Sequence, residues 1–125
     1  MFKSIVAVVL VVLMNSLAGA ADYRNITSRE AKTIHDANRK VLFLDVRTPQ
    51  EFAQGVIPGA LQIPISELER RRAEIPKNRP VIVYCAVGSR SRPVAQFLSR
   101  QGFGEVYNMT DGIFGWSRNG YQVVR

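Results

Sequence analysis

The chain is poor in the residues from which proteins build disulfides and metal sites. It contains one cysteine, Cys85, and one histidine, His35, among its 125 residues. A single cysteine excludes an internal disulfide, and one cysteine with one histidine makes no recognisable metal-ligand set. We therefore expect no metal and no cofactor. We interpret His35 as an ordinary surface or packing residue, and a cysteine–histidine protease is disfavoured because no base is placed beside the thiol.

Long apolar runs are also scarce, and the one clear case lies at the N-terminus. Lys3 precedes an unbroken apolar run at residues 5–14, and small residues follow at 18–20. These features predict a secretory signal peptide over residues 1–20, with cleavage between Ala20 and Ala21. The run falls short of the roughly 18 residues of a spanning helix, so a retained membrane anchor is the weaker alternative. We therefore expect an exported protein, in the bacterial periplasm, with no stable membrane anchor after cleavage.

The remaining residues, 21–125, are expected to form a single domain. A chain of this length buries about 60–70% of its unfolded surface, which suffices for a core without covalent staples. Basic residues exceed acidic ones by 17 to 10, a formal charge of +7 that loses one unit with Lys3. This excess serves solubility or attracts small anionic substrates. No basic stripe interleaved with aromatic residues is present, so nucleic acid is not an expected partner.

Strand and helix patterns alternate along this domain. Apolar runs at 41–46 and 81–84 are typical of strands buried on both faces. Capping boxes beginning at Thr27 and Ser66 predict helices reaching about residues 38 and 74. Other expected elements are a short helix within 48–52, a helix from 91 to the stop at Gly102, short strands at 60–62 and 106–107, a turn or short helix at 112–116, and a strand or tail at 121–124. The alternation indicates an α/β fold with a mostly parallel sheet.

The cysteine stands where the second apolar run ends. A short loop follows, and a helical pattern begins near Ser91 with Pro93 in its first turn. Free backbone N–H groups and a helix N-terminus would converge on the thiol, which favours an anion there. Gly88 permits the loop to curl, and Arg90, with Arg92 as a further candidate, adds positive charge. Such an environment lowers a thiol pKa from ~8.5, so Cys85 is predicted to be a nucleophile.

The size of the loop restricts what it could hold. Tyrosine-phosphatase-type enzymes separate cysteine and arginine by five residues, which surround a tetrahedral phosphate. Only four residues lie between Cys85 and Arg90 in this chain: Ala86, Val87, Gly88 and Ser89. The smaller ring favours a terminal sulfur anion on the cysteine and disfavours a phosphatase or arsenate reductase.

Four segments form a recognisable pattern: residues 45–52 (DVRTPQEF), 55–60 (GVIPGA), 85–91 (CAVGSRS) and 112–116 (GIFGW). Together these segments resemble the single-domain rhodaneses, a family of thiosulfate and related sulfurtransferases. They follow the order of the family and span most of residues 23–125. The resemblance implies a three-layer fold, with a central five-stranded parallel sheet and helices on both faces.

The resemblance also implies a mechanism. Cys85 would take the outer sulfur of a small anionic donor such as thiosulfate, and the persulfide would pass it to cyanide, a small thiol or a protein thiol. Backbone N–H groups of residues 86–90 would hold the persulfide, and Arg90 would bind the charged end of the donor. Asp45 and Arg47 would support the loop, more through a salt bridge than through chemistry. The chain is expected to be a monomer.

Two positions depart from the family pattern. Val56 stands where a histidine is frequent, and Asp111 stands where a second glycine is frequent. We interpret both as changes in loop packing, and Phe114 and Trp116 as core residues or the lip of the site. A persulfide carrier without turnover, or a partner-binding module, remains the alternative to a free enzyme, because carrier and enzyme need the same persulfide.

Overall fold

The computed structural model describes residues 22–125. The predicted signal peptide lies outside the described residues. Within residues 22–125, none of the helices has both the length and the apolar character required to cross a bilayer.

The sheet has five parallel strands in the order β1-β5-β4-β2-β3. The strands are β1 (Arg24–Ile26), β2 (Leu42–Asp45), β3 (Leu61–Gln62), β4 (Val81–Tyr84) and β5 (Val106–Met109). All four residues of the central strand β4 are fully buried. The predicted parallel α/β fold is confirmed, and the apolar runs of β2 and β4 account for it because strands covered on both faces need apolar residues at every position.

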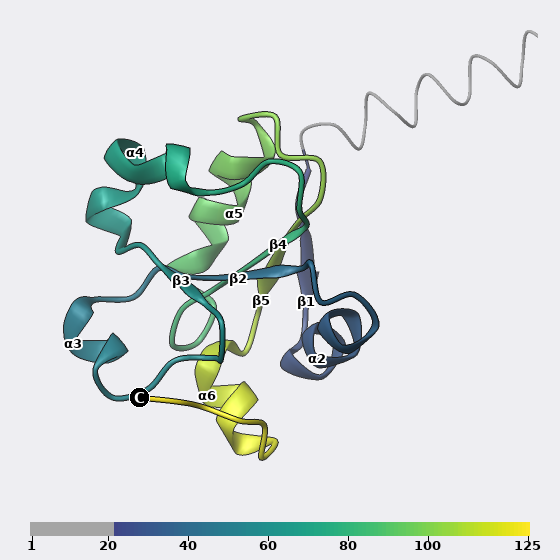
Figure 1. Cartoon of the computed structure of the whole chain (residues 1–125), viewed down its shortest axis with the longest axis vertical. Helices are drawn as coiled ribbons and strands as arrows, with labels where there is room; N and C mark the ends of the chain where they lie inside the picture. Colours follow the sequence, from purple (N-terminus) through teal and green to yellow (C-terminus); the bar gives the residue numbers. More distant parts are fainter. Residues whose placement is uncertain (1–21) are drawn as a thin grey trace, which may run out of the picture.

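Side chains of each strand alternate between two hydrophobic cores, one on each face of the sheet. Val81 and Val83 of β4 join the core beneath α4 (Leu68–Arg71) and α5 (Ser91–Ser99). Ile82 and Tyr84 join the core beneath α2 (Ser28–Ala37) and α6 (Gly112–Arg118). Figure 1 shows this three-layer arrangement, with α4 and α5 on one side of the sheet and α2 and α6 on the other.

Two of the helices begin with reciprocal capping boxes. In the predicted box at α2, the Thr27 side chain accepts from the Glu30 N–H, and Glu30 accepts from the Thr27 N–H. The same pair of bonds joins Thr48 and Glu51 at α3 (Pro49–Phe52), where the sequence indicated only a turn and a short helix. Each cap satisfies backbone N–H groups that have no partner inside the helix.

The predicted capping box at Ser66 is wrong. Ser66 lies inside a 3-10 turn, η1 (Ile65–Glu67), and α4 begins at Leu68 with no side-chain cap. The Glu67 N–H already bonds to the Pro64 carbonyl, so the chain has turned before a cap at Ser66 could form. A second 3-10 turn, η2 (Arg72–Glu74), completes the segment. Arg70 and Arg71 of α4 pair with Glu67 and Glu74 at the surface, as is usual for a solvated helix face.

The C-terminal segment ends against the loop that follows α3. Val124 and Val56 exchange backbone hydrogen bonds of 2.7 and 2.9 Å as an isolated antiparallel bridge. The segment 121–124, for which a strand or a tail was predicted, thus forms a single bridge. Val56, where the family often has histidine, is buried in this contact, which agrees with a packing role. His35 packs on Phe43 with ring centroids 5.0 Å apart, also as a packing residue.

Candidate active site

Cys85 follows the central strand β4 directly and lies at the carboxyl edge of the sheet. Loop residues 86–90 separate it from α5, which begins at Ser91. Asp45, the last residue of the neighbouring strand β2, pairs in register with Tyr84. Because parallel strands end at the same edge, Asp45 and Cys85 are brought to the same side of the molecule. The Cys85 side chain is fully buried.

The sulfur of Cys85 is surrounded by hydrogen-bond donors from the loop and from the start of α5. The Gly88 N–H donates to Sγ over 3.1 Å, and the Ser91 N–H over 3.4 Å. The thiol itself lies 3.4 Å from the Ser91 hydroxyl, to which it donates. The sequence pointed to N–H groups of residues 86–90 and missed Ser91, although a hydroxyl residue at the start of a helix signals such a role.

These contacts determine how readily the thiol ionises. Burial opposes ionisation and is the largest single influence on it. The Ser91 hydroxyl and the backbone N–H groups of Ser91, Val87 and Gly88 act in the opposite direction and outweigh it. The pKa of Cys85 is therefore lowered below its usual value, as the strand–loop–helix pattern led us to expect.

Two glycines hold the loop in place because their positions admit no side chain. Gly88 has φ +91°, and a Cβ there would come within 2.2 Å of the Thr110 carbonyl oxygen. A Cβ on Gly112 would come equally close to the Ala86 carbonyl oxygen. That close approach lets the first turn of α6 bond to the loop: the Ile113 N–H donates to the Cys85 carbonyl, and the Phe114 N–H to the Ala86 carbonyl.

Asp111, the second departure from the family pattern, ties α6 to α2. Its carboxylate accepts from the Ser28 N–H at 2.8 Å and from the Ser28 hydroxyl at 2.6 Å. A glycine could make neither bond. Its role in packing the α6 turn therefore agrees with the sequence interpretation.

Asn108 lies behind Ser91 and was not singled out by the sequence. It belongs to β5, is 2% exposed, and its Oδ1 lies 2.6 Å from the Ser91 hydroxyl oxygen. Its Nδ2 donates to Oδ1 of Asn25, its register partner on β1, over 3.2 Å. A polar residue inside an apolar strand near the carboxyl edge was the available signal, since buried amides need partners.

Asp45 and Arg47 form a buried salt bridge beside the loop. The Arg47 guanidinium contacts both carboxylate oxygens, the shortest distance being 2.7 Å from Nη2 to Oδ2. The Arg47 N–H also donates to Asp45, and Nη2 donates to the Gly55 carbonyl at 2.7 Å. The pair thus fixes the chain between β2 and residue 55, which fits the supporting role expected for it.

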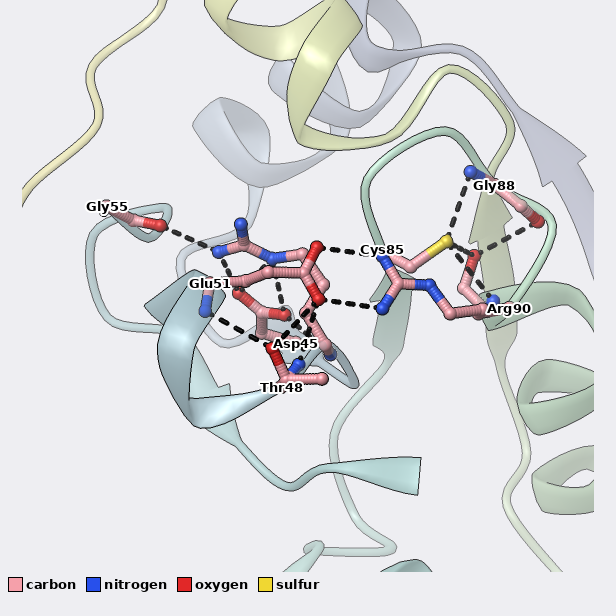
Figure 2. Close-up of polar contacts among 9 residues, drawn as sticks. Asp45, Thr48, Glu51, Gly55, Cys85, Gly88 and Arg90 are labelled. Atoms are coloured by element: carbon pink, nitrogen blue, oxygen red, sulfur yellow. Dashed lines mark hydrogen bonds and ion pairs between the residues drawn. The ribbon is translucent and has the colours of Figure 1, made fainter. Parts of the chain in front are cut away.

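Arg90 is paired with a glutamate that the sequence did not indicate as a site residue. Nη1 and Nη2 of Arg90 contact Oε1 and Oε2 of Glu51 at 2.7 and 2.9 Å. The hydrogen bond from Arg90 is the main cause that lowers the pKa of Glu51 to about 2. Figure 2 shows this pair between the Asp45 group and the Cys85 loop. Arg90 makes no bond to the sulfur here, so donor binding by Arg90 remains a prediction.

Apolar side chains stand exposed beside the buried sulfur. Val87 is 58% exposed and Phe114 is 62% exposed, and the Phe114 backbone bonds to the residue that precedes Val87. Ser89 is exposed as well, and Ala86 is half-buried. Trp116 is 3% exposed and its indole N–H donates to the Gln122 carbonyl. Trp116 is therefore a core residue, whereas Phe114 and Val87 form an apolar lip.

Comparisons with known proteins point to one family. Residues 27–119 match the family described as the rhodanese-like domain. A protein of Allochromatium vinosum named sulfurtransferase is 48% identical over 84 residues, which cover 67% of this chain and 78% of that protein. A Bacillus subtilis protein named as a candidate sulfur carrier, YrkF, is 31% identical over 82% of this chain, but the match spans only 56% of that protein.

A solved structure agrees with the fold as well. The crystal structure of a rhodanese-related protein from Thermoplasma volcanium is 34% identical and aligns with a TM-score of 0.73, covering 82% of this chain and 98% of that one.

Proposed function

The chain belongs to the rhodanese-like domain family, and from this premise we propose that it transfers sulfane sulfur through a persulfide on Cys85. The observation that carries the proposal is the buried sulfur of Cys85, which the N–H groups of Gly88 and Ser91 surround. These donors lower the pKa of the thiol and would equally stabilise an anionic sulfur attached to it. The name of the Allochromatium relative supports the same reaction class.

The reaction has two balanced steps. The Cys85 thiolate attacks the outer sulfur of thiosulfate, a sulfur–sulfur bond forms, and the bond to the sulfonate sulfur breaks with release of sulfite dianion. The enzyme now carries a persulfide anion. Cyanide then takes the terminal sulfur as thiocyanate, or a thiolate takes it as a new persulfide, and the Cys85 thiolate is restored.

Each loop residue has a role in these steps. The backbone N–H groups of residues 86–90 hold the terminal sulfur anion, and Arg90 binds the sulfonate of the donor. Because Arg90 is paired with Glu51 in the resting protein, the donor must compete with that carboxylate. Asp45 and Arg47 hold the neighbouring loop in place and leave the sulfur untouched.

A persulfide carrier is the second candidate, and the apolar lip favours it. Val87 and Phe114 are both exposed, on segments that a backbone hydrogen bond joins next to Cys85, and exposed apolar side chains that lie together mark sites of protein–protein contact. Small anions such as cyanide gain no affinity from contact with these apolar side chains. A protein that presents a thiol could bury both side chains in its interface. The name of YrkF, a candidate sulfur carrier, supports the same role.

The deciding experiment measures thiosulfate-dependent transfer to cyanide, with intact mass recorded before and after thiosulfate, beside the Cys85→Ser variant. A gain of one sulfur atom that cyanide removes, absent from the variant, supports the persulfide. Steady turnover with cyanide or glutathione supports the enzyme. Single loading, with release only to a protein thiol, supports the carrier, and no gain of sulfur rejects both.

We also propose that the protein is exported to the bacterial periplasm, on the signal-peptide features of residues 1–20. Expression of the full chain in a Gram-negative host, followed by fractionation and N-terminal sequencing, tests this. Recovery from the periplasm with Ala21 as the first residue supports export, and an uncleaved chain in the cytoplasm or the membrane contradicts it.

A further inference from the structure

The Ser91 hydroxyl has one proton to donate and three hydrogen-bonding atoms around it. Its oxygen lies 2.6 Å from Asn108 Oδ1, 3.2 Å from the Gly88 carbonyl oxygen and 3.4 Å from Cys85 Sγ. Ser91 is fully buried and Asn108 nearly so, which leaves no exposed side for water to serve. The shortest contact is to an acceptor, so the proton lies toward Asn108 and the oxygen lone pairs face the sulfur.

This orientation suits a thiol and not a sulfur anion. A neutral thiol donates its proton to the Ser91 oxygen, as the geometry shows. A thiolate or persulfide can only accept, so the Ser91 proton must turn toward the sulfur before the hydroxyl can stabilise it. If Asn108 kept its Oδ1 in place, that acceptor would then face a lone pair of the Ser91 oxygen. The conflict disappears if Asn108 turns its amide and offers Nδ2 to Ser91.

The surroundings of Asn108 permit this rotation. Its Nδ2 now makes only long contacts, 3.2 Å to Asn25 Oδ1 and 3.5 Å to the Gly88 carbonyl oxygen. Asn25 is exposed on β1 and can turn its own amide to match, because an amide carries both a donor and an acceptor. Reversal of the Asn108 amide therefore costs only the 3.5 Å contact to the Gly88 carbonyl, which can only accept, while Asn25 restores the other bond.

We propose that Asn108 is a positioning residue whose side-chain amide sets the direction of the Ser91 hydroxyl. In one orientation Ser91 accepts from the Cys85 thiol, and in the other it donates to the thiolate or persulfide. The part of this proposal that concerns the persulfide rests on the proposed function. The hydrogen-bond relay itself concerns the free thiol and is tested without a sulfur donor.

The charged groups near the loop are paired with one another or with other residues, so they do not replace the hydrogen bond between Ser91 and the sulfur. Arg90 interacts with the thiol but is paired with Glu51, and the Asp45 carboxylate at the end of β2 is paired with Arg47. Asp111, at the start of α6, bonds to Ser28. The Ser91 hydroxyl is in direct contact with Sγ, whereas each of these charged groups is matched by a partner of its own, so the direction of the hydroxyl acts on the sulfur directly.

The test measures the pKa of Cys85 from the pH dependence of alkylation by iodoacetamide. The chain has one cysteine, so the signal has a single source. In Asn108→Asp a carboxylate that only accepts keeps the Ser91 proton away from the sulfur, and the pKa is expected to rise by about one to two, the worth of a hydrogen bond to a charged group. In Asn108→Leu only the Gly88 carbonyl oxygen, at 3.2 Å, still competes for the Ser91 proton, and the pKa is expected to stay or fall.

Two further variants separate the relay from simple charge and from misfolding. In a Ser91→Ala background, Asn108→Asp should raise the pKa by less than half as much, because only its charge then acts. Asn25→Asp changes an exposed residue, is expected to fold, and holds Asn108 Nδ2 toward β1. It should raise the pKa by a few tenths and do so only when Ser91 is present.

Three results would overturn the relay. They are equal pKa changes in Asn108→Asp and Asn108→Leu, an undiminished effect in the Ser91→Ala background, and a Cys85 pKa that ignores every Asn108 and Asn25 variant despite unchanged circular dichroism. Failure of sulfur loading with a pKa that follows the expected pattern would reject the proposed function and leave the relay standing.

Discussion

The ends of strands β2 and β4 place two ionisable groups, Asp45 and Cys85, at the same edge of the sheet. The two groups differ in the kind of partner that surrounds them. At the end of β2, the Asp45 carboxylate is matched by the Arg47 guanidinium and N–H, and Arg47 is matched in turn by the Gly55 carbonyl. After β4, the Cys85 sulfur receives neutral donors only. Figure 2 shows both groups and the Glu51–Arg90 pair between them.

The difference separates a charge that holds structure from a charge that can react. A full countercharge makes a carboxylate inert, and breaking such a buried pair is costly. Neutral N–H donors stabilise a sulfur anion without closing off its remaining lone pairs, so the sulfur stays a nucleophile. Three variants that break one region at a time should therefore separate stability from activity.

The largest effect is expected from Cys85→Ser. Sulfur transfer should fall by at least ~1000-fold, because a serine hydroxyl forms no persulfide and the covalent route is lost. The free energy of unfolding should change by less than about 1 kcal/mol, since the side chain keeps its size. Transfer assays and urea denaturation check both numbers. Transfer retained above a hundredth of the original would contradict the assignment of the nucleophile.

Asp45→Ala breaks the other region and should destabilise the protein by about 3–5 kcal/mol, because it leaves the buried Arg47 without a countercharge. The matched control is Asp36→Ala on α2, which removes an exposed pair with Lys32 and should cost at most about 1 kcal/mol. Urea denaturation of both variants is the measurement. Equal costs would show that the Asp45–Arg47 bridge does not lock the fold.

Gly88→Ala sharpens the comparison at the donor loop. The new Cβ would collide with the Thr110 carbonyl and displace the N–H that bonds to the sulfur, so kcat/KM should fall about 100-fold, as for a lost anion-stabilising donor. Gly59→Ala is the control. It shares a positive φ of +78° but meets no atom within 4 Å, and it should cost about 1 kcal/mol of stability with activity unchanged. Similar activity losses in both variants would argue against a specific donor role.

Arg90→Gln and Glu51→Gln should shift the KM for thiosulfate in opposite directions by about 5-fold, which corresponds to about 1 kcal/mol. Loss of the Arg90 charge weakens donor binding, whereas Glu51→Gln frees the guanidinium and keeps an acceptor for the Thr48 cap. Initial rates at varied thiosulfate check both. A rise in KM for both variants would mean that Glu51 holds Arg90 in its productive position.

The smallest effect concerns pH. Because Arg90 holds the folded-state pKa of Glu51 at about 2, well below 4.5, their pair stabilises the fold above pH ~4.5 and is lost as pH falls toward 2. Both side chains are partly exposed, so the contribution should not exceed about 1 kcal/mol. Unfolding of the wild type and of Glu51→Gln at pH 3 and 6 measures it. An equal pH dependence in the two proteins would contradict the assignment.

The elements that could be predicted from the sequence are those governed by local chemistry. The apolar runs that became β2 and β4, the capping box at Thr27, and the position of Cys85 at the end of β4 all rest on short-range patterns. The predicted capping box at Ser66 is wrong because the backbone already turns at Pro64 and Ile65. The side-chain pattern from which the box was predicted gives no information about that turn. The C-terminal segment was ambiguous because a single bridge to Val56 needs a partner far along the chain.

The sequence by itself determined the place of the single cysteine after an apolar run, the loop length and the family pattern, because these depend on residues adjacent in the chain. Only the tertiary structure decided which partners those residues received. Arg90 faces Glu51 across 39 positions, and Ser91 meets Asn108 across 17, since strands and helices remote in sequence end at one edge of the sheet. The charge state of the site and the direction of its hydroxyl depend on those contacts, which no local pattern records.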